Sequence, residues 1–331
     1  GAETNTPYSI ANMGNINSPF YFTTEAAAQV DPGYQLNTQA QSPDYDYNWG
    51  SSSGALAGLS VEAAGDVDGD GVMDYIFGSP AWSSVTDAEG NSVAAKGLFH
   101  LVFGQAGQWD DLNTIDDLKD QGRVVSFYGT SVNQLIRATE FGDLNHDGYN
   151  DLIITAGGQN PVIGDNTASD TADDDSGAVF VIFGKDRDQW DDLMSADNLG
   201  DDGLIITGGL PQDAYGFSVA SGDFNNDGQE DLVQSTVSPQ RILVWLANPS
   251  SNNSVTIGLE GSVSNHDGIG AIIEVHAGNK QLIKQVTCGE SFYGQSSQHE
   301  LFGLGAANLI DSVVVNWPSG WTDMMYAVDA N

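Results

Sequence analysis

The sequence has little cysteine, few basic side chains and no long apolar run. The single cysteine, Cys288, excludes an internal disulfide framework and a cysteine-based zinc site, and we interpret it as a small buried residue. Without an apolar run of about 18 residues, no transmembrane helix and no membrane insertion are predicted. The chain begins at Gly1 without a charged and apolar leader, as we expect of a processed mature chain. The remaining composition, 40% hydrophobic over 331 residues, is sufficient for a folded core.

The scarcity of basic residues restricts the partners of the chain. Nine Lys and Arg stand against 46 Asp and Glu, which gives a formal net charge of −37. A surface of this sign repels nucleic acid and anionic membranes, so neither is expected as a partner. Cations are the natural partners. An acidic surplus also keeps extracellular proteins soluble, so the charge alone implies no site.

An Asp-rich segment occurs three times, as Gly65-Asp-Val-Asp-Gly-Asp-Gly71, Gly142-Asp-Leu-Asn-His-Asp-Gly148 and Gly222-Asp-Phe-Asn-Asn-Asp-Gly228. The first aspartates of the copies are 77 and 80 residues apart. The flanking sequence repeats as well, because the apolar segments 97–104 and 177–184 are each followed by Gln-Trp-Asp-Asp-Leu. The chain therefore contains a copied structural unit.

The units are predicted to be built of short strands. Apolar or alternating runs such as 75–77, 152–154 and 179–183 lie between clusters of Gly, Asp and Ser, which is typical of strands separated by turns. Helix is expected only as single turns near 110–118 and 191–199, where the Trp residues are interpreted as packing anchors. The acidic insertion Asp165–Asp175 is predicted to be a surface loop. The fold class expected is all-β.

The spacing Asp-x-(Asp/Asn)-x-Asp-Gly-x-x-Asp in each copy predicts a calcium loop. It places side-chain oxygens at positions 1, 3, 5 and 9 and a main-chain carbonyl at position 7, and calcium takes six to eight oxygens at about 2.3 to 2.6 Å. Polar turns held by Asx hydrogen bonds are the alternative for any single copy, but three copies at full spacing favour metal. About three Ca²⁺ ions are predicted, with these ligands: Asp66, Asp68, Asp70, Val72 and Asp74; Asp143, Asn145, Asp147, Tyr149 and Asp151; Asp223, Asn225, Asp227, Gln229 and Asp231.

These loops differ from EF-hands. Position 12 holds Phe77, Ile154 and Gln234, where an EF-hand has a bidentate glutamate, and the flanking segments are strand-like. The glycine at position 6 permits the left-handed backbone that a tight ion-binding loop needs. His146 occupies a non-ligand position of the second copy and is interpreted as an exposed side chain.

The units resemble the FG-GAP repeats of the integrin α-subunit type, particularly their bacterial relatives. The resemblance rests on Tyr215-Gly-Phe-Ser-Val-Ala-Ser-Gly-Asp223 and on Gly78-Ser79-Pro80, which matches the Gly-Ala-Pro element; 156–158 matches it in part and 235–237 poorly. It covers about residues 54–247. The resemblance implies β-propeller blades in which the loop between two strands holds calcium structurally.

A second resemblance covers the C-terminal part, which is similar to the ASPIC/UnbV module. It rests on Gly261-Ser-Val-Ser-Asn-His-Asp-Gly-Ile-Gly-Ala271, Phe302-Gly-Leu-Gly305 and Asp311-Ser-Val-Val-Val-Asn-Trp-Pro-Ser-Gly320, with Gly294-Gln-Ser-Ser297 between them. The resemblance implies a small β-domain of the kind that follows such propellers in secreted proteins. Strand-like runs at 271–275, 282–286 and 312–315 agree.

The domain organisation follows from these two resemblances. Residues 1–58 are an N-terminal arm or partial blade, residues 59–250 are a propeller-like domain with three calcium loops, and residues 251–331 are the C-terminal β-domain. Three calcium loops are fewer than a complete ring of integrin type contains. Either residues 1–58 and the C-terminal domain close the structure within one chain, or another copy or a partner completes it as an oligomer or filament.

The function expected is that of a secreted, extracellular or cell-surface module that binds a protein or glycan partner. Adhesion, a surface role and self-assembly all fit this class. A calcium-dependent lectin is the alternative, and a secreted hydrolase is a further one. No catalytic residues and no organic cofactor are predicted, since no Gly-x-Ser-x-Gly, His-Glu-x-x-His or phosphate-binding glycine loop occurs in the sequence.

Overall fold

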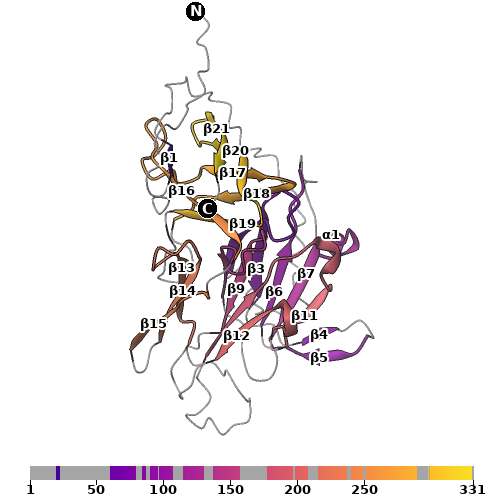
Figure 1. Cartoon of the computed structure of the whole chain (residues 1–331). Coiled ribbons are helices and arrows are strands. Elements are labelled where there is room, and N and C mark those ends of the chain that lie inside the picture. The colour runs from indigo at the N-terminus through magenta and orange to yellow at the C-terminus, as the bar shows by residue number, and fades with distance from the viewer. Residues whose placement is uncertain are drawn as a thin grey trace, which may run out of the picture.

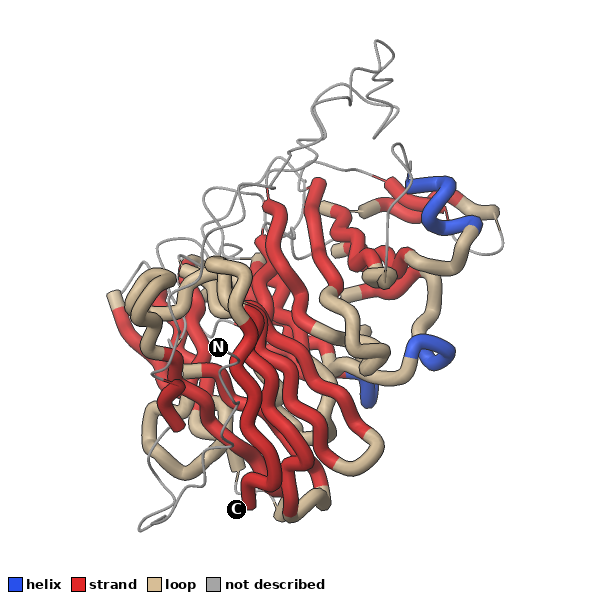
Figure 2. The backbone as a smooth tube through the Cα atoms, turned by 90° about the horizontal axis from the view of Figure 1, so that it is seen from above, coloured by secondary structure: helices blue, strands red, loops and turns tan. Residues whose placement is uncertain are grey.

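The computed structural model shows a chain built almost wholly of strands, as predicted (Figure 2). Among the described residues, five sheets of three to five strands carry the three repeats and the C-terminal domain, and a two-stranded sheet belongs to the first repeat. The structure describes residues 20–22, 60–79, 84–86, 90–95, 97–106, 115–129, 137–156, 177–196, 198–207, 215–236, 240–248, 251–288, 297 and 299–329.

The first repeat forms a five-stranded sheet in the order β11-β7-β6-β3-β2. All neighbours are antiparallel except β11, which comes from the next repeat and pairs in parallel with β7. A hairpin of β4 and β5 and the helix α1 lie between these strands in sequence. The bounds are β2 Ser60–Gly65, β3 Asp74–Ser79, β4 Ser84–Thr86, β5 Ser92–Ala94, β6 Leu98–Val102, α1 Ile115–Asp120, β7 Val124–Tyr128 and β11 Leu193–Ser195.

The second and third repeats form antiparallel sheets in the orders β12-β10-β9-β8 and β13-β14-β15. Two short 3₁₀ turns, η1 and η2, lie between β10 and β12. The bounds are β8 Arg137–Phe141, β9 Asp151–Thr155, β10 Ala178–Ile182, η1 Arg187–Gln189, η2 Gly200–Asp202, β12 Gly203–Thr207, β13 Ser218–Gly222, β14 Asp231–Thr236 and β15 Arg241–Trp245.

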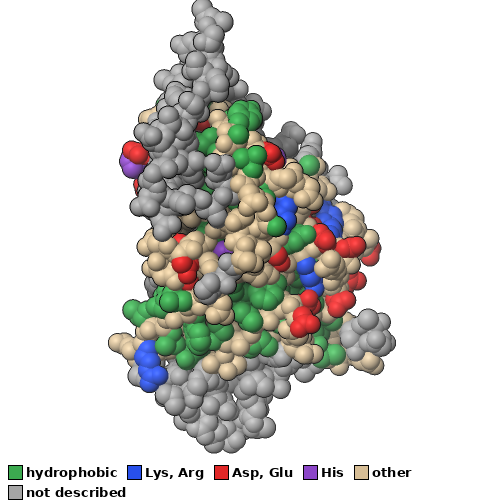
Figure 3. Space-filling model, viewed as in Figure 1, with side chains coloured by type: hydrophobic (Ala, Val, Ile, Leu, Met, Phe, Trp, Pro, Cys, Tyr) green, Lys and Arg blue, Asp and Glu red, His purple; other side chains and the backbone are tan. Residues whose placement is uncertain are grey.

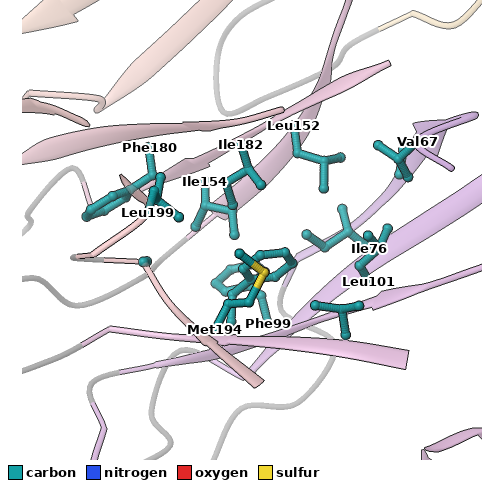
Figure 4. Packing of buried hydrophobic residues seen from close by; sticks show 14 of the residues in the cluster. Val67, Ile76, Phe99, Leu101, Leu152, Ile154, Phe180, Ile182, Met194 and Leu199 are labelled. Carbon is teal, nitrogen blue, oxygen red and sulfur yellow. The ribbon is translucent and has the colours of Figure 1, made fainter. Parts of the chain in front are cut away.

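The three repeat sheets pack face to face, which explains the continuous apolar runs of the middle repeat. Leu152 and Ile154 of β9 enter the core shared with the first sheet (Figure 4), whereas Ile153 between them enters the core shared with the third. Because side chains alternate along a strand, a sheet covered on both faces needs apolar residues at every position. This stacking of successive sheets is the arrangement of propeller-like blades.

The C-terminal module, residues 251–329 of the description, forms two further sheets with a core of their own. The larger has the order β18-β17-β20-β21, and the smaller joins β16 and β19. Figure 1 shows these strands above the repeat sheets. The bounds are β16 Asn253–Leu259, β17 Ile272–Ala277, β18 Lys280–Gln285, β19 Glu300–Gly305, β20 Leu309–Asn316 and β21 Thr322–Asp329.

The N-terminal strand β1 belongs to the C-terminal module. The strand β1 (Phe20–Phe22) lies within residues 1–58, which were predicted to be an N-terminal arm or partial blade. It pairs in parallel with β16, with Phe20 opposite Ile257, and extends the smaller sheet. The described part of residues 1–58 therefore completes the C-terminal module and not a blade.

Two local expectations turn out differently. The segment expected to be a helical turn at 191–199 contains the strand β11, because Met194 and Ala196 complete the apolar core of the first sheet. Cys288 is exposed, where burial was expected. The acidic insertion 165–175 lies outside the described residues. Trp190 is a packing anchor as predicted, 9% exposed between Phe103 and Phe127, whereas the first-repeat Trp109 lies outside the description.

Candidate metal loops

Each predicted calcium loop joins the first two strands of its sheet. The first loop (residues 66–74) joins β2 to β3, the second loop (143–151) joins β8 to β9, and the third loop (223–231) joins β13 to β14. Positions 4 and 6 of each loop have left-handed backbone, which explains glycine at position 6 and Gly, His or Asn at position 4. The φ values are Gly69 72°, His146 57° and Asn226 58° at position 4, and Gly71 81°, Gly148 93° and Gly228 81° at position 6.

The aspartate at position 1 holds the turn of the loop closed. Its carboxylate accepts the N–H of the position-6 glycine, at 3.0 Å from Gly71 to Asp66, 2.7 Å from Gly148 to Asp143 and 2.9 Å in the third loop. The position-5 aspartate accepts the N–H of position 7 at 2.8 to 3.0 Å. These bonds bring the carboxylates of one loop toward a common centre.

The aspartate at position 9 fastens each loop to the sheet. Asp151 is fully buried, and its two oxygens accept N–H bonds from Leu144 at 2.8 Å and from Gly184 at 3.0 Å. Asp74 and Asp231 make the same pair of bonds in their loops. Because one bond comes from the loop and the other follows the third strand of the sheet, this residue ties three strand ends together.

The first loop offers the tightest group of possible ligands. One oxygen each of Asp66, Asp68 and Asp74 lies within 4.8 Å of the others, and all three residues are buried. Asp66 Oδ1 is buried without any hydrogen-bond partner. Burial, reinforced by the nearby charges of Asp68 and Asp70, raises the pKa of Asp66 to about 7. A buried carboxylate oxygen without a partner, beside two other acids, fits a hard divalent cation.

The second loop has the same chemistry and is more deeply covered. Burial, with Asp147 nearby, raises the pKa of Asp143 to about 7, and burial raises that of Asp151 well above its usual value. Both shifts express the cost of buried negative charge that has no cation close enough to offset it fully. The third loop is more open, since Asp227 and Asn225 are exposed.

Among the described residues, the structure brings together the carboxylates of three predicted ligands, Asp66, Asp68 and Asp74 in the first loop, and it adds one correction. The ligand sets of the other two loops remain predictions. His146 is buried at 1% exposure, where an exposed side chain was expected, and neither ring nitrogen has a hydrogen-bond partner. Burial lowers its pKa, so the imidazole is neutral. The carbonyl ligands assigned to Val72, Tyr149 and Gln229 remain predictions.

The three loops lie in contact with one another. Asn150 N donates to Asp66 O at 3.0 Å, and the ring of Tyr149 lies against Gly69 of the first loop. Glu230, in the third loop, lies against Gly142 at the start of the second. Spacing in the sequence revealed each loop but carried no signal that the loops meet, because their contacts depend on how the sheets stack.

The C-terminal module covers the second loop, which sequence reasoning did not foresee. Asn252 Nδ2 donates to His146 O at 2.9 Å, and Gly303 lies so close that a Cβ there would collide with the Asp143 carboxylate. Ser254 Oγ donates to Gly228 O in the third loop at 2.6 Å. The burial of His146 follows from this cover.

Comparison with known proteins confirms both resemblances. Residues 137–182, which contain the second loop, match the FG-GAP repeat family, and residues 261–331 match the ASPIC and UnbV family. The chain is 23% identical over 203 residues to integrin alpha-PS2 of Drosophila melanogaster. That alignment covers 60% of this chain but 13% of the integrin. The chain thus corresponds to a small part of this relative.

Proposed function

We propose that this chain is a secreted or cell-surface interaction module whose three loops bind calcium, and that the calcium is structural. The observation that carries the proposal is the first loop, where three buried aspartates converge and one oxygen of Asp66 has no partner. The FG-GAP match and the alignment with an integrin α-subunit support a role in adhesion or partner binding. No described helix is long and apolar enough to cross a membrane.

The cover of the second loop favours structural calcium over calcium that contacts a ligand. Gly148 and Asn150 are buried, and the C-terminal module contacts the loop, so this module covers part of the approach that a sugar hydroxyl would need to an ion there. A bound ion would neutralise the aspartates and fix the turn that joins two strands. The ion would then serve to compensate the negative charge of the loop aspartates within the fold.

We also propose that the chain has no catalytic activity. A hydrogen bond joins the side chains of His100 and Ser126, from Nδ1 to Oγ at 2.8 Å, but both residues are buried in the first sheet. Burial lowers the pKa of His100 to about 3, so it is too weak a base to activate a hydroxyl near neutral pH. Turnover of an ester, glycoside or phosphate substrate, abolished by one substitution outside the loops, would contradict this proposal.

Calorimetric titration of the chelator-stripped chain tests the calcium proposal. We expect at least three calcium ions to bind and the melting temperature to rise, because each site adds about 2.7 kcal/mol when free calcium is 100-fold above its Kd. Asp70→Ala removes one ion, whereas Asp173→Ala in the acidic insertion leaves the number unchanged. Absence of binding at millimolar calcium refutes the proposal. A glycan array in calcium would separate protein from glycan partners.

A further inference from the structure

The interface between the C-terminal module and the repeats is made largely by donors that reach main-chain carbonyls of the loops. Lys280 Nζ donates to Asp147 O, and Asn252 Nδ2 and Ser254 Oγ donate to carbonyls of the second and third loops. Ser297 N donates to Ser221 O, just before the third loop, at 3.1 Å. The C-terminal module therefore contacts the repeats at the predicted metal loops.

Among these donors Lys280 carries a full positive charge. It begins β18 directly after the turn at Gly278, and its ammonium lies 5.3 Å from the centre of the Tyr149 ring. It lies against the backbone of Gly148, where a Cβ would meet Nζ. The ammonium thus lies against the middle of the second loop, next to the predicted ligands Asp147 and Tyr149.

A second lysine of the same strand points to the same loop. Lys284 follows Lys280 by four residues and therefore lies on the same face of β18. It is 3% exposed, its ammonium lies 5.6 Å from the centre of the Phe302 ring, and its charge lowers the pKa of Asp143. Two of the nine Lys and Arg residues of the chain therefore place positive charge near the second loop.

The first loop is arranged differently. There a cation from the repeats, Arg187, pairs with Asp68 at 3.4 Å and is partly exposed. At the second loop the positive charge of Lys280 comes instead from the C-terminal module.

We propose that Lys280 is a built-in countercharge that opposes calcium at the second loop and makes this loop a weaker calcium site than it would be without the lysine. The inference rests on the proposed calcium binding at that loop. An ammonium group a few ångströms from a divalent ion repels it, and the repulsion is screened only in part at a covered site. Because the coupling between two interactions is reciprocal, calcium in the second loop also weakens the hydrogen bond from Lys280 Nζ to Asp147 O.

The test is a calorimetric calcium titration of the full chain and of three variants. Lys280→Met removes the charge but keeps the length of the side chain, Lys280→Arg keeps the charge, and Lys119→Met removes one charge from the exposed Lys119 of α1. We expect Lys280→Met to tighten one site, that of the second loop, roughly three- to tenfold. Lys280→Arg and Lys119→Met should leave all affinities near those of the wild type.

Two further measurements assign the effect. In an Asp147→Ala background, the gain from Lys280→Met should vanish, because the second loop no longer binds the ion. In chelator, Lys280→Met should lower the melting temperature, and saturating calcium should remove most of that loss. A Lys280→Met chain that binds calcium more weakly than the wild type, or with unchanged affinities, overturns the inference while leaving the proposed function intact. Absence of any calcium binding overturns both.

Discussion

At the scale of single residues, the loops combine buried acids with a backbone that leaves few choices of side chain. Asp143 accepts N–H groups from Asp147 and Gly148, and such bonds favour the ionised carboxylate. Burial nevertheless raises the pKa of Asp143 and that of Asp66 to about 7. A carboxyl group of this kind releases its proton near neutral pH, in the range where a cation can take the proton's place.

This predicts how the stability of the calcium-free chain depends on pH. The pKa of Asp66 and Asp143 is raised by folding, so between about pH 4 and pH 7 the folded chain holds protons that the unfolded chain has released. The contribution of these two acids to stability should therefore fall as pH rises from about 4 to about 7 and level off above. Denaturant unfolding in chelator measures it, with a parallel series in saturating calcium as the control.

Calcium should reverse that trend, because the ion binds the ionised carboxylates. Its apparent affinity should rise with pH up to about 7, with protons released on binding below that pH. Calorimetry in two buffers of different ionisation enthalpy detects the protons. A calcium-free chain that becomes more stable as pH rises toward 7 would show that these acids are ionised in the fold.

At the scale of the element, each loop contains aspartates with two different structural roles. Asp151 is buried and bonded to Leu144 and Gly184, so it belongs to the sheet as much as to the metal site. Asp147, at position 5, is half-buried, and its carboxylate accepts hydrogen bonds from Asn145 and Tyr149 of its own loop. The spacing in the sequence makes the two look equivalent, and the structure separates them.

We therefore expect different outcomes from two alanine substitutions in the second loop. Asp151→Ala leaves two buried N–H groups without acceptors and should lower the free energy of unfolding by roughly 2–3 kcal/mol even in chelator. Asp147→Ala should cost about 1 kcal/mol or less in chelator and abolish the stabilisation by calcium at this loop. Urea unfolding with and without calcium checks both. Equal losses in chelator would mean that position 9 has no separate structural role.

The sequence predicted the strands and loops well, for a physical reason. Apolar runs such as those of β9 and β10 cannot be accommodated outside a buried sheet, and the glycine at position 6 reports directly on its left-handed backbone. Residues 191–199 were misassigned because the contacts of Met194 with the first sheet overrode the local pattern. The burial of His146 depends on Asn252, about a hundred residues away, and no local pattern encodes it.

At the scale of the whole molecule, the outer face of the third repeat sheet exposes apolar side chains. In the second repeat, Val179 and Val181 of β10 are fully buried beneath the third sheet. In the third repeat the corresponding strand, β15, exposes Ile242 by 76% and Val244 by 52%. Figure 3 shows hydrophobic side chains gathered on the lower part of the molecule, the part that Figure 1 assigns to the sheets of β12 and β15.

The register of the strands shows that these residues occupy equivalent places. Val181 pairs with Ile153, and Val244 pairs with Val233, at the same position of the second strand in each sheet. The face that each repeat turns toward its successor is therefore apolar in both, but the third repeat has no following sheet among the described residues. Exposed contiguous apolar surface of this kind typically marks an interface.

We expect the chain to associate through this face with a second copy, as the shortage of repeats already suggested. Ile242→Asp places a charge on the face and should shift the chain toward monomer by at least tenfold in dissociation constant, because burying an unpaired carboxylate costs more than about 1.4 kcal/mol. Val263→Asp, on a loop of the C-terminal module where Val263 is 42% exposed, is the matched control. Light scattering in millimolar calcium measures both variants. Deleting residues 1–24 is a poorer test, since it removes β1 from its pairing with β16. A wild-type chain that stays monomeric at high concentration refutes association through β15.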